Sequence, residues 1–160
     1  MKPDTLTATA EIGVPESDVF DVLANPSTHA AIDGTGWVRE PVDGDRLDHV
    51  GQVFKMGMYH ENHPDKHYEM ANRVEVFDRP SAISWQPGQF SADTGELELG
   101  GWTWRYDLAP AGSDVTKVTL TYDWSAVTAE IRDEIQFPPF EQQHLDNSLE
   151  HLAQLATGPL

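Results

Sequence analysis

The most constraining feature of the sequence is a change in hydrophobic period near residue 125. Between residues 51 and 124, apolar side chains recur at every second position, which is typical of strands that cover a core with one face. Residues 137–158 instead repeat with the helical period of about 3.6. The alternating segments are GQVFKMGMY, YEMANRVEVF, AISWQP, GWTWRYDL and KVTLTYDW. The pattern predicts an antiparallel sheet followed by one long amphipathic helix.

The first 33 residues predict a strand and two short helices. Residues 5–14, TLTATAEIGV, have the Thr and β-branched content of a strand. The segment VPESDVFDVLANP has Pro15 at a first helical turn and ends at Pro26. Residues 26–33 predict the second short helix. Further along, the composition of APAGSD (residues 109–114) predicts a turn between the last two strands.

The C-terminal segment predicts a helix that packs through one arc. Pro138 and Pro139 stand at its start, and Gly158 followed by Pro159 ends it. A twisted sheet can curl around such a helix and bury its apolar side. The predicted apolar arc contains Phe137, Leu145, Leu149, Leu152, Leu155 and Ala156.

This order of elements resembles the START-like (SRPBCC) superfamily, in particular its polyketide cyclase/dehydrase-like branch. The resemblance is carried by VPESDVFDVLANP, by GGWTWRYDLAP with VTKVTLTYDWS, and by FPPFEQQHLDNSLEHLAQLA, and it covers nearly the whole chain. It implies an α+β helix-grip fold, in which a curved antiparallel sheet wraps around the C-terminal helix. It also implies a cavity for small apolar or aromatic molecules, lipid-like or polyketide-like. Residues 1–160 are expected to form a single such domain.

Composition and charge exclude several classes of partner. The formal net charge is −17 with ten Lys and Arg residues, which argues against binding nucleic acid or an anionic membrane surface. Cysteine is absent, so thiolate sites are excluded. Neither a signal peptide nor a membrane span is recognisable in the sequence. We therefore expect a soluble, cytoplasmic protein that is a monomer or a weak homodimer and needs no cofactor.

Strand alternation and the helical arc predict which side chains face the interior. A ligand pocket is mostly apolar and aromatic with a few polar groups, and the predicted set has this character. The same side chains could equally fill a core, and a buried Asn72 would need a partner in either case. Val74 and Val76 share the predicted face of Asn72. The candidate ligand-binding residues are Phe54, Met56, Met58, His60, Tyr68, Met70, Asn72, Trp104, Tyr106, Tyr122, Glu141, Leu145, Ser148 and Leu152.

Histidines gather in YHENHPDKHYE, residues 59–69. His60, His63 and His67 lie close together there, with Glu61 and Asp65 between them. The spacing fits no metal motif, and Pro64 with Asp65 indicates a reverse turn. We therefore predict a solvated turn without a metal, from which strand parity points His60 alone toward the pocket.

The residues leave three functions open. The first is a binding protein for an apolar or aromatic metabolite, and the second is a cyclase or dehydratase. In such an enzyme His60, Tyr106, Tyr122 or Glu141 would transfer a proton. The third is a co-chaperone-like interaction module, which predicts an exposed apolar patch. Arg105 and Asp107 alternate out of phase with the inner set, so we expect them on the solvent side as cross-strand charge partners.

Overall fold

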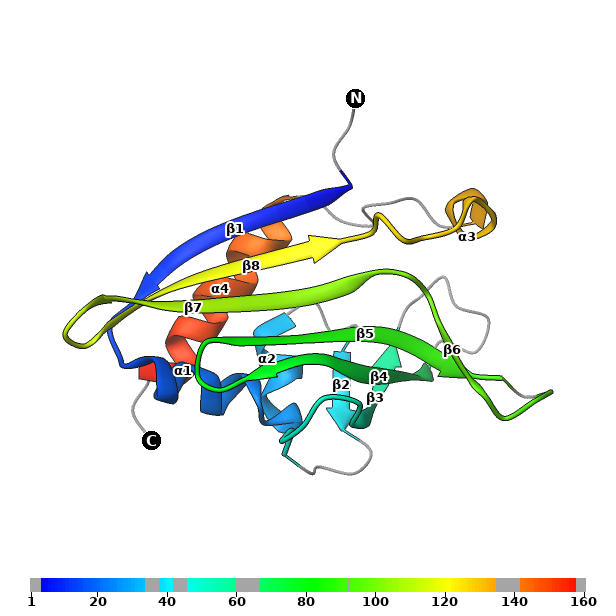
Figure 1. The fold of residues 1–160 in the computed structure, drawn as a ribbon, viewed down its shortest axis with the longest axis horizontal. Coiled ribbons are helices and arrows are strands. Elements are labelled where there is room, and N and C mark those ends of the chain that lie inside the picture. The colour runs from blue at the N-terminus through cyan, green and yellow to red at the C-terminus, as the bar shows by residue number, and fades with distance from the viewer. Residues whose placement is uncertain are drawn as a thin grey trace.

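The computed structural model describes residues 4–33, 38–41, 46–59, 67–91, 93–134 and 142–157. Strands form the largest share of this part of the chain, and the longest helix comes last (Figure 1). The elements in chain order are β1 (Thr5–Ile12), α1 (Glu16–Leu23), the 3-10 turn η1 (Pro26–Thr28), α2 (His29–Asp33), β2 (Val38–Pro41), β3 (Val53–Tyr59), β4 (His67–Asp78), β5 (Ala82–Phe90), β6 (Leu97–Leu99), β7 (Thr103–Gly112), β8 (Val115–Asp123), α3 (Ala129–Glu134) and α4 (Gln142–Thr157).

The strands of the described residues form one antiparallel sheet in the order β1-β8-β7-β5-β4-β3-β2, with β6 paired to β5. The sheet curves, and α4 crosses its inner side behind β1, β8 and β7 (Figure 1). Helix α4 packs mainly against β1, α2 and α1. This arrangement confirms the predicted α+β architecture of a curved sheet around a C-terminal helix. No helix of the described residues is long and apolar enough to cross a membrane.

The core lies between the sheet and α4. Leu145, Leu149 and Leu152 of α4 are buried, and Ser148 is buried among them. Leu155 was predicted on the same arc, but its side chain is 39% exposed. It lies at the edge of the arc near the end of the helix, where fewer neighbours cover it. The predicted arc is therefore too wide at Leu155, and Phe137 lies outside the described residues.

A β-bulge in β4 changes which side chains reach the core. The register with β5 shifts between Val74 and Val76, so the strand reverses its faces there. Phe77, and not Val76, then packs against the core, with its ring centroid 5.2 Å from that of Phe20. The prediction that Val76 shares the face of Asn72 is wrong for this reason.

Three further differences concern short or extended elements. Strand β7 continues to Gly112 and β8 begins at Val115, so most of the predicted turn at residues 109–114 is strand. Pro15 precedes the first helix as its N-cap residue and does not lie in its first turn. Strands β2 and β6 and helix α3 were not predicted, because segments of three to six residues show no clear period.

Candidate functional site

The inner face of β3 and β4 is closed at one end and more open at the other. Directly opposed residues of an antiparallel pair share a face, so each pair points inward together. Phe54, Met56 and Asn72 are buried, whereas Met58, Tyr68 and Met70 are only half-buried. Exposure therefore increases toward the end of β3 and the start of β4, and we call Met58, Tyr68 and Met70 the open end. The opposed pairs are Phe54 with Asn72, Met56 with Met70, and Met58 with Tyr68.

Aromatic side chains continue this face across β5, β7 and β8. Trp85 of β5 is paired with Trp104 of β7, which is paired in turn with Tyr122 of β8. The ring centroids of Trp104 and Tyr122 are 4.6 Å apart, and those of Trp85 and Tyr106 are 5.9 Å apart. Tyr106 and Tyr122 are buried, while both tryptophans are half-buried. We call these four residues the aromatic shelf.

Each tryptophan of the aromatic shelf contacts a histidine from a helix. His29, the first residue of α2, stacks on Trp85 with 4.8 Å between ring centroids and 14° between planes. The ring centroids of His144 in α4 and Trp104 are 6.0 Å apart, with 65° between the ring planes. The phenol of Tyr122 lies beside this pair, and its burial raises the pKa of the hydroxyl. Among the described residues, the helices therefore bring imidazoles to both tryptophans of the shelf.

His29 is buried, and its protonation state follows from its contacts. Its Nε2 lies 2.8 Å from the carbonyl oxygen of Leu23, which can only accept, so Nε2 carries the proton. The ring also packs edge-on against Phe54, with 5.6 Å between the ring centroids. Burial lowers the pKa of His29 to about 4, so the ring is neutral at pH 7. Sequence reasoning missed His29, because a helix of five residues is too short for its period to indicate a face.

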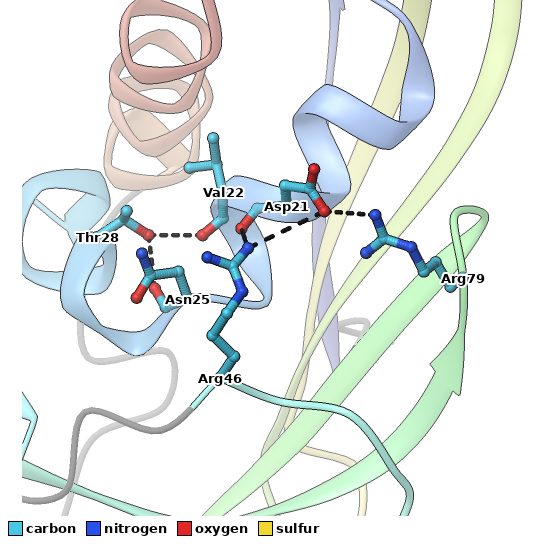
Figure 2. A network of polar contacts seen from close by, with 6 residues as sticks. All are labelled: Asp21, Val22, Asn25, Thr28, Arg46 and Arg79. Carbon is cyan, nitrogen blue, oxygen red and sulfur yellow. Dashed lines mark hydrogen bonds and ion pairs between the residues drawn. The ribbon is translucent and has the colours of Figure 1, made fainter. Parts of the chain in front are cut away.

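The position of His29 is fixed by the C-terminal end of α1. A helix leaves its last carbonyl groups without partners inside the helix. Here three consecutive carbonyls of α1 accept from three side chains: Asp21 from Arg46 (3.0 Å), Val22 from Thr28 (2.6 Å) and Leu23 from His29 (2.8 Å). Figure 2 shows the first two of these contacts. The contacts of Thr28 and His29 hold the start of α2 against the end of α1, with the imidazole over Trp85.

The carboxylate of Asp21 adds charge contacts at the same place. It pairs with Arg79, and Arg46 lies 4.0 Å from it (Figure 2). The guanidinium of Arg79 also lies 5.2 Å from the centroid of the Phe20 ring. Asp21 therefore joins α1 to the segment before β3 and to the β4–β5 turn.

We expect Asp21→Asn to lower the free energy of unfolding by at most about 1 kcal/mol, because all three side chains are roughly half exposed. Urea denaturation at low salt and in 1 M NaCl measures the effect. The difference from wild type should shrink in salt. Glu150→Gln, on the exposed face of α4, serves as the control. A loss that is unaffected by salt would contradict an electrostatic role for Asp21.

Asn72 finds its partner inside the sheet. Its Nδ2 donates to the carbonyl oxygen of Phe54 across the strand pair at 3.3 Å. The buried amide that the sequence singled out is therefore satisfied by backbone, as buried polar groups usually are.

His151 and several residues named in the sequence analysis lie away from the aromatic shelf or outside the described residues. His60, Glu141, His63, Glu61 and Asp65 belong to the second group. His67 begins β4, with its ring 5.1 Å from that of Tyr59. His151 of α4 is half-buried, and its Nδ1 lies 3.0 Å from the carbonyl oxygen of Ile32. Within the described part of the chain, no group of three or more His, Asp or Glu residues is placed to hold a metal ion.

A surface depression of about 410 Å³ lies on the outer face of the sheet, opposite the aromatic shelf. There Arg105 Nε donates to both carboxylate oxygens of Asp107 at 3.0 Å, and this hydrogen bond raises the pKa of Arg105. Both residues lie on the solvent side, as predicted, with their side chains roughly half exposed. The predicted cross-strand pairing is wrong, because the residues opposite them on β5 and β8 are uncharged. The depression is lined by Asp78, Ser81, Ala82, Arg105, Asp107, Leu108, Ala109, Lys117 and Thr119.

Solved structures share this arrangement of sheet and helix. Protein CV1439 from Chromobacterium violaceum superimposes with a TM-score of 0.68 at 15% identity, covering 98% of this chain and all of that one. The major latex-like protein 151 of ginseng (Panax ginseng) gives 0.62 at 13% identity, covering 96% and 97%. Norcoclaurine synthase from Thalictrum flavum gives 0.60 at 16% identity, covering 98% and 94%. The chain has the helix-grip fold.

Sequence comparison adds distant relatives. No family model matches the chain. The uncharacterized protein Rv0088 of Mycobacterium tuberculosis is 24% identical over 135 residues, which are 84% of this chain and 54% of that protein. The helix-grip chain thus spans about half the length of the curated relatives that it matches.

Proposed function

We propose that this helix-grip protein binds a small apolar or aromatic molecule on the inner face of its sheet, against the aromatic shelf and the open end. The observation that carries the proposal is the partial exposure of Met58, Tyr68, Met70, Trp85 and Trp104 beside buried neighbours. Large apolar side chains gathered on one partly exposed face are typical of a ligand site. A bound ring would remove this area from water.

The comparisons support a small-molecule role at the level of the fold. One protein of the same fold is a synthase by name, and fold alone does not select a reaction. Placement in the polyketide cyclase/dehydrase-like branch of the START-like superfamily is part of this proposal, as is a lipid-like or polyketide-like ligand. A cytoplasmic location and a monomeric or weakly dimeric state stay predictions from the sequence.

Binding is favoured over proton transfer at His29 and Tyr122. His29 and Tyr122 are both neutral at pH 7, and burial opposes the charged form of each. A general acid or base works best with a pKa near the operating pH, and neither group meets this condition. Among the described residues, the exposed large apolar side chains are Val50, Phe90 and Leu155, which lie before β3, in β5 and in α4 and do not indicate one docking patch.

We expect 2-methoxynaphthalene to bind in isothermal titration calorimetry, and Met70→Trp to weaken binding at least about tenfold by filling the open end, a change of about 1.4 kcal/mol. The matched variant Thr119→Trp fills the outer depression instead and should leave the affinity unchanged. Circular dichroism checks that both variants are folded. Weaker binding in Thr119→Trp with normal binding in Met70→Trp would move the site to the outer face and overturn the proposal.

A further inference from the structure

We propose that His29 is the polar anchor of this site, and that the ligand is a planar aromatic molecule whose neutral hydroxyl group donates a hydrogen bond to His29 Nδ1. The inference rests on the proposed function, which it deepens by naming the chemical class of the ligand. Four observations lead to it: the tautomer of the ring, the access to Nδ1, the stacking geometry and the absence of charge on the shelf.

The tautomer makes Nδ1 an acceptor. Because Nε2 donates to the Leu23 carbonyl at 2.8 Å, the neutral ring has no second proton, and Nδ1 presents a lone pair. The ring is held in this state by the end of α1 and does not depend on a ligand. A group that pairs with Nδ1 must therefore bring the proton of the hydrogen bond.

Nδ1 is not sealed inside the core. Every fully buried side-chain nitrogen or oxygen of the described residues has a hydrogen-bond partner. The His29 ring makes no hydrogen bond to a described residue other than the one to Leu23. His29 is 7% exposed, so the accessible part of an otherwise enclosed side chain includes this nitrogen. Nδ1 can therefore accept a hydrogen bond from a ligand that carries a donor group.

The surroundings of the ring suit a planar and uncharged ligand. His29 is stacked on Trp85, which is itself stacked near Tyr106, so flat groups already pack here face to face. The aromatic shelf and the open end contain no carboxylate, Lys or Arg side chain. An ammonium or carboxylate ligand would lose its hydration there without a counter-ion from any residue of the shelf or the open end. The net charge of −17 further disfavours an anion.

The low basicity of His29 indicates that a ligand hydroxyl would donate a hydrogen bond to it and would not transfer its proton. Burial lowers the pKa of His29 to about 4, whereas a phenol has a pKa of about 10. Moving the proton from such a hydroxyl to Nδ1 would be unfavourable by about a factor of a million. The hydroxyl therefore keeps its proton and His29 orients the ligand without acting as a base.

The test compares 2-naphthol with 2-methoxynaphthalene, which has the same rings but no donor. In calorimetry, wild-type protein should bind 2-naphthol about three- to tenfold more tightly, the value of one hydrogen bond. In His29→Phe this preference should vanish, so that both probes bind the variant with equal affinity, because phenylalanine offers no hydrogen-bond acceptor. Equal affinity of wild type for the two probes, or a preference that survives in His29→Phe, would overturn the inference and leave the proposed function standing.

A second measurement needs no variant, in case His29→Phe does not fold. The ¹⁵N resonance of His29 Nδ1 in wild-type protein should lie at the position of an unprotonated imidazole nitrogen. It should move on addition of 2-naphthol and not of 2-methoxynaphthalene. If 2-naphthol binds and the Nδ1 chemical shift does not change, the role of His29 as the anchor is contradicted, but the proposed function is not. If neither probe binds, both this inference and the proposed function are contradicted.

Discussion

Replacing Leu152 by alanine should lower the free energy of unfolding by about 2–5 kcal/mol. Leu152 is completely buried in the middle of the α4 face that packs against the sheet. Removing its side chain loses the transfer free energy of three carbons and leaves a cavity, because the neighbouring buried residues Leu145 and Leu149 are held by the same helix. Urea denaturation followed by circular dichroism measures the change.

Leu155→Ala is the matched control on the same helix. Its side chain is 39% exposed, so the same substitution should change the free energy of unfolding by about 0.5 kcal/mol or less. Similar losses at both positions would mean that α4 is rotated relative to the sheet. The comparison of the two variants therefore tests which face of α4 packs against the sheet.

The second large effect is a pH dependence that comes from His29. A His with a folded-state pKa of about 4 and an unfolded-state pKa of 6.5 binds its proton more readily when unfolded. Its contribution to stability is fully present above pH 6.5 and is lost as the pH falls from 6.5 toward 4. Over that window the loss amounts to about 3 kcal/mol. The described neighbours of the ring, Trp85, Phe54 and the Leu23 carbonyl, do not titrate in this range.

His29→Gln isolates this contribution, because its amide can still donate to Leu23 but does not titrate. The 27 Asp and Glu residues affect both proteins alike, so the difference between the two stability curves reports His29. We expect wild type to lose stability faster than His29→Gln between pH 6.5 and 4 in urea denaturation. Parallel curves would show that His29 titrates normally and is not buried as described.

The architecture could be predicted from the sequence because buried and exposed residues alternate regularly along most of the strands. Alternation in β3, β7 and β8 placed Phe54, Tyr106 and Tyr122 inside without knowledge of strand order. The prediction failed at Val76, because a bulge shifts the register without a distinctive residue to mark it. It also failed at Leu155, where the extent of cover depends on packing near the helix end.

The candidate site was less accessible to sequence reasoning than the fold. Asn72 could be recognised as a buried amide, but its partner is a backbone carbonyl of β3, which no side-chain pattern specifies. His29 stands out only after α2 folds back over β5, since Trp85 is 56 positions away in the chain. Contacts of this kind come from tertiary packing, and local periodicity carries no signal for them.

The most direct test of ligand binding on the inner face uses methionine methyl groups. Of the four methionines, Met56, Met58 and Met70 lie on the inner face of β3 and β4, and Met1 precedes β1. In ¹³C-methyl-methionine protein titrated with 2-methoxynaphthalene, the ring current of a bound probe should shift the Met58 and Met70 signals strongly and leave Met1 unchanged. Saturable binding by calorimetry without any shift of Met58 or Met70 would contradict the inner-face site.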